Sequence, residues 1–193
     1  MQHDPRIRAF LADLETLVGR GEAIPKTVQD VKERLTSLLA QRPLLPDQVR
    51  RTSGNYYARH LLHQDPQGRF EVVVMTWSPG QQTPVHDHSG IWCVEGVCEG
   101  VVDVTRYNLL EMVRADVARM EPSEVIHAGL GQCGALIPPV EYHRISNPYA
   151  DLALTLHVYG GRMRSCRVFL EAEGDLYKVS EKPLEFASTA AAV

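Results

Sequence analysis

Two patterns that would indicate export or membrane insertion are missing from this 193-residue sequence. Its first ten residues carry no apolar run behind a basic end, and no later stretch approaches the roughly 18 to 20 apolar residues of a membrane span. Cysteine is also scarce, because the four that occur form no CxxC pair and are too few for a disulfide scaffold at this length. We therefore expect a cytoplasmic protein with reduced cysteines.

Clusters of positive charge are missing as well. The formal net charge is -4, the isoelectric point is near 6.1, and no block of Lys or Arg stands out. Phosphate backbones and anionic lipid surfaces are bound by clustered positive charge. We therefore expect neither nucleic acid nor a membrane as a partner, and we expect a monomer or a small homo-oligomer.

The first part of the chain shows helical periodicity. Apolar residues recur at helical spacing over 7–18 and again over 28–39. The first helix is predicted to end at Gly19, and the second to begin at Thr27 as its N-cap and to end before Pro43. Neither helix carries a cluster of catalytic residue types. We interpret residues 1–48 as a helical cap packed on the main body of a single domain that spans 1–193.

From about residue 50 the pattern changes to short β-rich runs, broken by Gly, Pro, Asn and Asp at intervals near ten residues. This pattern is typical of an antiparallel sandwich or barrel, and no βαβ alternation or internal repeat is visible. The sequence thus predicts a mainly β jelly roll over 50–187, followed by a frayed tail at 188–193, with 123–129 as a turn-like segment. The predicted strands are 56–63, 70–77, 91–98, 101–109, 112–120, 134–137, 142–146, 152–159 and 167–171.

Three histidines are spaced as metal ligands. In an extended segment residues i and i+2 project from one face, so the imidazoles of His86 and His88 can reach one point. A His-x-His pair alone is equally often a pair of surface or hydrogen-bonded histidines. Here, however, Gly80 and Gly100 flank the pair and His143 follows about fifty-five residues later. This layout resembles the two cupin motifs, in which a third histidine reaches the site from another strand.

The carboxylate ligand of the ordinary cupin motif is missing from its expected place. That glutamate stands four or five residues after the second histidine, where this chain has Trp92 and Cys93. Glu95 is the nearest acid, and we expect it to need an irregularity in the strand to reach inward. A neutral site of three histidines leaves a metal dication uncompensated, so an anionic thiolate can bind directly. The pattern therefore favours iron with an incoming sulfur.

The predicted strand over 152–159 alternates strictly between apolar and polar residues. Leucines and a valine form one face, and Thr155, His157 and Tyr159 lie on the other. A half-exposed strand with its polar face in water would show the same alternation. Hydroxyl, imidazole and phenol at successive positions are instead typical of groups that support a metal site. We therefore predict that this face points inward.

Together these residues resemble the cysteine dioxygenase family, whose members are cupins. The resemblance covers about 56–169, more than half of the chain. Thr155, His157 and Tyr159 stand in place of the family's Ser-His-Tyr triad. The other shared features are His86-Asp87-His88, Cys93 five residues past the second ligand, His143-Arg144, Tyr57-x-Arg59 ahead of the strand that ends in Trp77-x-x-Gly80, and Cys166 seven residues after the tyrosine.

The resemblance implies an enzyme and a role for each of these residues. His86, His88 and His143 would bind Fe(II), and both atoms of dioxygen would be added to the sulfur of L-cysteine to give the sulfinic acid. The substrate is then a small thiol, with dioxygen as its co-substrate. Arg59, with Tyr57 nearby, would bind the substrate carboxylate, and Cys166 would form a wall of the pocket. His157 would orient the Tyr159 hydroxyl, and Thr155 would fix the tautomer of the His157 imidazole. Cys93 and Tyr159 would form a thioether crosslink.

Other functions stay open at this point. Arg162, Arg164 and Arg167 follow the polar strand closely. They could grip the carboxylate of another thiol acid, such as 3-mercaptopropionate or mercaptosuccinate. A cupin that only binds a metal or ligand, and a zinc or manganese cupin with isomerase or hydrolase activity, are the alternatives from other classes.

Overall fold

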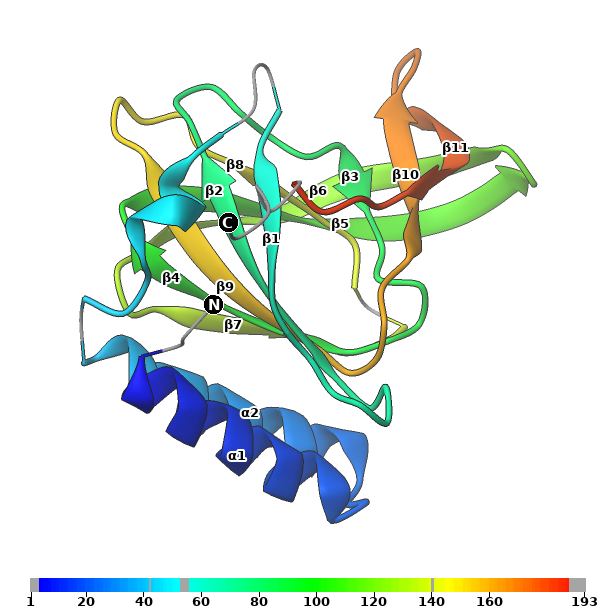
Figure 1. Ribbon diagram of the computed structural model, residues 1–193. Helices are drawn as coiled ribbons and strands as arrows, with labels where there is room; N and C mark the ends of the chain where they lie inside the picture. The colour runs from blue at the N-terminus through cyan, green and yellow to red at the C-terminus, as the bar shows by residue number, and fades with distance from the viewer. Residues whose placement is uncertain (1–3, 42, 53–55, 140, 188–193) are drawn as a thin grey trace.

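The computed structural model describes residues 4–41, 43–52, 56–139 and 141–187, so the predicted frayed tail at 188–193 lies outside the described residues. Two helices lie against one side of a body of antiparallel strands (Figure 1). The prediction of a mainly β fold with a helical pair at its start is confirmed. The non-strand elements are α1 (Pro5–Gly19), α2 (Ile24–Leu39) and the 3-10 helix η1 (Asp47–Arg50).

The strands form two sets, and every strand pairing in the described residues is antiparallel. A five-stranded sheet carries the helices, and the other six strands form a closed ring. The sheet contains, in spatial order, β1 (Ala58–Gln64), β2 (Glu71–Trp77), β9 (Ala153–Tyr159), β4 (Cys93–Glu99) and β7 (Cys133–Leu136). The ring contains β10 (Ser165–Glu171), β11 (Leu176–Pro183), β6 (Val117–Gly129), β5 (Val101–Arg114), β8 (His143–Ser146) and β3 (Val85–His86).

The predicted helix N-cap at Thr27 is wrong. α2 begins three residues earlier, at Ile24, with Ala23 as its N-cap and without a capping side chain. Pro25 lies in the first turn, where its fixed φ suits a helix and its missing N–H costs no hydrogen bond. Thr27 is instead buried on the inner face of the helix. The helix ends at Leu39, before Pro43 as predicted.

The helices pack closely on the five-stranded sheet because one strand position has no side chain. A Cβ at Gly96 of β4 would lie 2.6 Å from a methyl group of Leu39 and 2.7 Å from the sulfur of Cys133. The apolar stripes of both helices form one buried cluster with the outer face of the sheet. Leu154 and Leu156 of β9 belong to this cluster. The polar residues of β9 therefore face the other way, toward the ring, as predicted.

The long hairpin of β5 and β6 departs from the prediction. β5 continues to Arg114 and β6 runs on to Gly129, so 123–129 is strand and not turn. The pairing continues through three register irregularities. Leu110 and Val125 are about half exposed on this hairpin. No regular alternation marks such exposed strands in the sequence.

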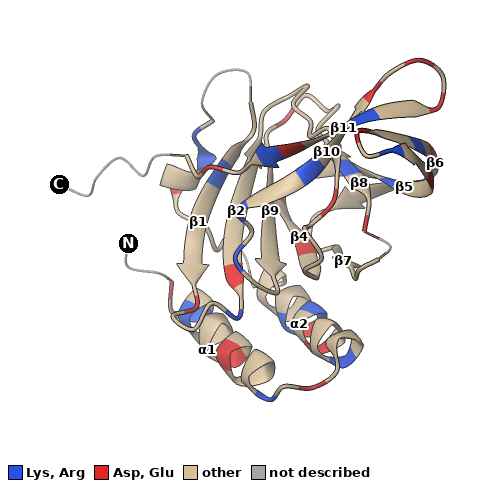
Figure 2. Ribbon diagram, turned by 90° about the vertical axis from the view of Figure 1, so that its right-hand side faces the viewer, with Lys and Arg blue, Asp and Glu red and all other residues tan. Residues whose placement is uncertain are grey.

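Two ring strands escaped prediction for different reasons. β3 has only two residues, and β11 is mostly polar and exposed. Figure 2 shows Lys and Arg interspersed with Asp and Glu along helices and strands. None of the helices in the described residues is both long and apolar enough to cross a membrane.

Candidate metal centre

The three predicted ligands converge between the five-stranded sheet and the ring. His86 ends β3, His88 follows it by two residues, and His143 begins β8 as the register partner of His86. Their ring centroids are 4.6 to 5.3 Å apart, and one nitrogen from each ring lies within 4.8 Å of the others. The antiparallel pairing of strands β3 and β8 thus brings together histidines that are far apart in the sequence.

The imidazoles are in the form that binds a metal. Burial lowers the pKa of His86 to about 4. Burial, together with the neighbouring imidazoles, holds the pKa values of His88 and His143 well below the usual value for histidine. All three rings are therefore neutral near pH 7 and can offer a lone pair. His143 Nε2 is buried without a hydrogen-bond partner in the described residues. The donor set fits a metal dication.

The inner faces of β4 and β9 lie beside this centre. Cys93 pairs directly with Tyr159 in the antiparallel register. Directly opposed side chains in such a pair have Cβ atoms about 4.5 to 5.5 Å apart. Tyr159 is buried, with its ring centroid 5.9 Å from that of His88 and 5.9 Å from that of His157. The structure thus brings the predicted Cys-Tyr pair together next to the histidine cluster.

A chain of hydrogen bonds defines the orientation of His157. Trp77 Nε1 donates to Thr155 Oγ1 at 2.9 Å, and Thr155 Oγ1 lies 2.7 Å from His157 Nε2. If the hydroxyl donates its own proton to Nε2, the neutral imidazole carries its proton on Nδ1. Burial, with a contribution from Arg59, lowers the pKa of His157 to about 3 and keeps it neutral.

Glu95 points inward, and the expectation that it would need a strand irregularity is wrong. Glu95 lies two residues after Cys93 on a regular part of β4, and the register shift comes later, after Val97. Its Oε1 is 3.7 Å from His143 Nδ1, and its Oε2 is 3.4 Å from His157 Nδ1. Burial raises the pKa of this carboxyl to about 7. Residues two apart on a strand share a face, so the alternation of β4 places Glu95 on the same inward face as Cys93.

A second inward acid went unnoticed in the sequence. Glu141 is 5% exposed, and its Oε2 lies 3.9 Å from His88 Nδ1. Burial raises the pKa of this carboxyl too. The segment before β8 carries it, and no periodicity there indicated which way its side chain points. Neither Glu95 nor Glu141 belongs to the ligand cluster of three histidines.

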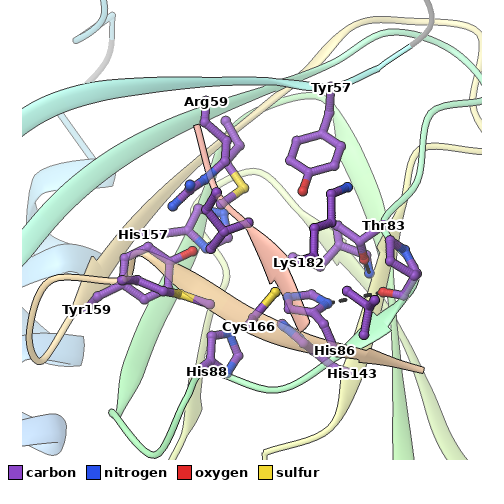
Figure 3. Close-up of a pocket in the computed structure, with 16 residues that line it drawn as sticks. Tyr57, Arg59, Thr83, His86, His88, His143, His157, Tyr159, Cys166 and Lys182 are labelled. Carbon is purple, nitrogen blue, oxygen red and sulfur yellow. Dashed lines mark hydrogen bonds between the residues drawn. The ribbon is translucent and has the colours of Figure 1, made fainter. Parts of the chain in front are cut away.

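Arg59 provides positive charge in the same pocket. It lies on β1, is only 5% exposed, and none of its three guanidinium nitrogens has a hydrogen-bond partner in the described residues. Tyr57 stacks on Trp77 near it, with ring centroids 4.7 Å apart. The pocket, with a free volume of about 20 Å³, is lined by these two residues, the histidine cluster and Cys166 (Figure 3). The guanidinium carbon of Arg59 lies 5.1 Å from the centroid of the Phe186 ring. A buried guanidinium without a hydrogen-bonded anion is costly.

Comparison with known proteins covers the same part of the chain. Residues 46–172 match the family model for cysteine dioxygenase type I. This chain belongs to the cysteine dioxygenase type I family. It is 25% identical to cysteine dioxygenase type 1 of Danio rerio over 119 residues, which are 61% of this chain and 58% of that protein. It is 24% identical to the Rattus norvegicus protein over 170 residues, 86% of this chain and 80% of that one.

Family membership confirms the predicted cupin fold. Among solved structures, an uncharacterised double-stranded β-helix protein from Klebsiella pneumoniae aligns with a TM-score of 0.46 and 19% identity. That alignment covers 64% of this chain and 93% of the Klebsiella protein.

The three arginines that follow β9 lie away from the pocket of this cysteine dioxygenase family member. None of Arg162, Arg164 and Arg167 is among its lining residues. Arg167 instead binds Asp87, its Nε lying 2.6 Å from Oδ2 of that carboxylate. Lys182 of β11 lines the pocket in their place and was not predicted (Figure 3). β11 was missing from the predicted strands, so no pattern directed attention to it.

Gly160 lies at a close contact at the end of β9. It is followed by Gly161, directly after Tyr159. A Cβ at Gly160 would lie 2.2 Å from the indole of Trp92. The Gly160 N–H also donates to the Trp92 carbonyl at 2.9 Å. The tryptophan therefore occupies the space that a side chain would need.

Proposed function

We propose that this protein is an Fe(II)-dependent thiol dioxygenase that converts L-cysteine to cysteine sulfinic acid. The observation that carries the proposal is the convergence of three neutral imidazoles beside a buried guanidinium that has no hydrogen-bond partner in the described residues. His86, His88 and His143 would hold the iron, which supplies the redox chemistry between dioxygen and the thiol. Sulfur loses four electrons and dioxygen gains four, so both oxygen atoms reach sulfur without another reductant.

The Arg59 guanidinium would bind the carboxylate of the substrate. Its planar fork matches the two oxygens of a carboxylate. Binding would also satisfy three nitrogens that have no partner in the described residues. Tyr57 and Cys166 would form walls of the pocket.

The polar face of β9 would support the reacting sulfur. Tyr159 would present its hydroxyl to the thiol or to dioxygen, and burial keeps it protonated because it raises the pKa of the phenol well above its usual value. His157 would hold the tyrosine ring in a parallel stack, at an interplanar angle of 13°. Thr155 would fix the tautomer of His157 through the 2.7 Å contact to Nε2. None of the four cysteines forms a disulfide in the described residues, and a cytoplasmic enzyme would keep them reduced.

Lys182 favours a second candidate substrate. It adds a second cation to the pocket that already holds Arg59. A thiol with two carboxylates, such as mercaptosuccinate, could engage both cations. A thiol with one carboxylate and no amine, such as 3-mercaptopropionate, would engage one of them.

An oxygen electrode tests the function and separates these substrates. Protein loaded anaerobically with Fe(II) is exposed to air with L-cysteine, 3-mercaptopropionate or mercaptosuccinate, and the products are identified by mass. We expect oxygen uptake matched by sulfinate formation, with kcat/KM highest for L-cysteine. A tenfold preference for another thiol acid, about 1.4 kcal/mol, would reassign the substrate. Absence of sulfinate from all three would refute the thiol dioxygenase assignment.

We further predict a partial thioether crosslink between Cys93 and Tyr159. The direct pairing of these residues supports it. A bond forms between the sulfur and a ring carbon as the S–H and a ring C–H are lost, and dioxygen accepts the two electrons and two protons. Intact mass after turnover should therefore include a species two hydrogen atoms lighter. Cys93→Ser should abolish that species and Cys98→Ser should keep it, whereas a lighter species in Cys93→Ser would disprove the assignment.

A further inference from the structure

Each of the three metal-site histidines has a hydrogen-bond acceptor near its Nδ1 atom. His86 Nδ1 lies 3.1 Å from the Pro84 carbonyl oxygen. The corresponding acceptors are Glu95 Oε1, 3.7 Å from His143, and Glu141 Oε2, 3.9 Å from His88. An imidazole that binds a metal through Nε2 carries its proton on Nδ1 and needs such an acceptor. Two of the three acceptors are carboxylates.

Both imidazoles and both carboxylates of these pairs contain a buried polar atom without a hydrogen bond in the described residues. His88 Nδ1, His143 Nδ1, Glu95 Oε2 and Glu141 Oε2 are all buried without a hydrogen bond. Distances of 3.7 and 3.9 Å are too long for a hydrogen bond, but closing movements of about 1 Å would make both bonds. Each buried polar atom left unpaired costs about 1–3 kcal/mol. Forming these two hydrogen bonds would therefore lower the free energy of the folded protein.

We propose that Glu95 and Glu141 are positioning residues that hold His143 and His88 for the metal. Each carboxylate would accept the Nδ1 proton, direct Nε2 toward the metal and increase the basicity of the ring. Their two negative charges would also compensate a dication that the three neutral ligands leave uncompensated. The inference rests on the metal site of the proposed function and not on the identity of the thiol.

Glu95 has a further contact that Glu141 lacks. Its Oε2 faces His157 Nδ1 at 3.4 Å, the nitrogen that carries the proton when Thr155 donates to Nε2. One carboxylate would then accept a hydrogen bond from His143 and another from His157. It would join the metal ligand to the polar face of β9. Loss of Glu95 should therefore disturb the orientation of His143 and that of His157, which stacks on Tyr159.

Co(II) binding tests this inference without relying on catalysis. Dissociation constants and visible spectra are measured under anaerobic conditions for wild type, Glu95→Gln, Glu95→Leu and Glu141→Gln. Each Gln variant should bind Co(II) about 10- to 100-fold more weakly, and Glu95→Leu more weakly still because it removes the acceptor as well as the charge. Glu71→Gln is the matched control, because it neutralises another buried carboxyl that is not part of the three-histidine cluster. Its affinity should stay within about twofold of wild type.

The melting temperature of the metal-free protein separates positioning from general support of the fold. Burying a neutral amide costs less than burying a carboxylate, so both Gln variants should melt at or above the wild-type temperature. If Glu95→Leu fails to fold, the two Gln variants decide the matter.

Three results would contradict this inference in distinguishable ways. If wild type binds Co(II) and the dissociation constants of both Gln variants are within threefold of the wild-type value, the inference fails and the metal site stands. If the Gln variants melt at a lower temperature but bind Co(II) as tightly as wild type, the two glutamates stabilise the fold and do not position the ligands. If wild type binds no Co(II), both the inference and the proposed function fail.

Discussion

Arg59→Ala should raise the Michaelis constant for the preferred thiol acid about 100-fold, or about 2.7 kcal/mol, and leave Fe(II) content unchanged. The expected loss is large because the guanidinium is buried and its three nitrogens have no partner in the described residues. A carboxylate that enters this pocket would satisfy them, and at 5% exposure the side chain has little contact with bulk water. Steady-state oxygen uptake measures the constant, and iron analysis checks the metal site.

Replacing Arg59 should also change the substrate preference and the thermal stability of the protein. Cysteamine, a thiol without a carboxylate, should be used by the variant about as well as by wild type, so the advantage of the thiol acid should shrink. Removing a buried cation that has no hydrogen-bond partner in the described residues should not lower the melting temperature of the substrate-free protein, and Arg59→Met, which keeps most of the volume, should raise it.

Arg164→Ala is the control for Arg59, because Arg164 is exposed and outside the pocket. Its Michaelis constant should match that of wild type. A change of less than threefold in Arg59→Ala would place the carboxylate elsewhere, with Lys182 as the next residue to replace.

The parts of this site that local patterns define were predictable. Strict alternation identified the inward face of β9, because a strand places alternate residues on opposite faces whatever its neighbours are. Helical spacing identified α1 and α2 in the same way. The histidine spacing, with its motif context, predicted that His86, His88 and His143 would converge, and the structure brings them together.

What the sequence did not show depends on pairing between distant segments. Lys182 reaches the pocket only because β11 pairs with β10, and β11 has no apolar alternation to mark it as a strand. Glu141 approaches His88 across a loop. Glu95 differs in kind, because the spacing of the cupin motif places a ligand at 92 or 93, whereas the alternation of β4 places residue 95 on the same face as Cys93. The direct pairing of Cys93 with Tyr159 is likewise a register, which no single strand specifies.

His143→Ala should abolish tight metal binding and, with it, thiol oxidation. Structural Zn²⁺ sites gain about 10 to 16 kcal/mol from four ligands, so one ligand contributes about 3 kcal/mol, and its loss weakens binding about 100-fold or more. A three-ligand site reduced to two should be affected at least as strongly. Isothermal titration with Co(II) measures the affinity, and oxygen uptake with Fe(II) measures the reaction.

The control for His143 is a histidine that lies away from the cluster. His127 is on β6, its side chain is 69% exposed, and its Nδ1 lies 2.8 Å from Asp103. His127→Ala should therefore bind Co(II) as wild type does. The metal-free His143→Ala protein should remain folded, because the lost ring has no hydrogen bond in the described residues and its removal leaves a cavity but no new unpaired donor.

The response of the outer carboxylates to His143→Ala adds a decisive comparison. With the ring gone, Glu95 has lost the ligand that it is proposed to hold, whereas Glu141 still faces His88. Adding Glu95→Gln to His143→Ala should therefore weaken the residual Co(II) affinity little, and adding Glu141→Gln should weaken it about as much as in wild type. Equal effects of the two additions would show that the carboxylates act through bulk charge and not through their own imidazoles. Wild-type affinity in His143→Ala itself would mean that the metal lies elsewhere, and the proposed sulfur chemistry would lose its centre.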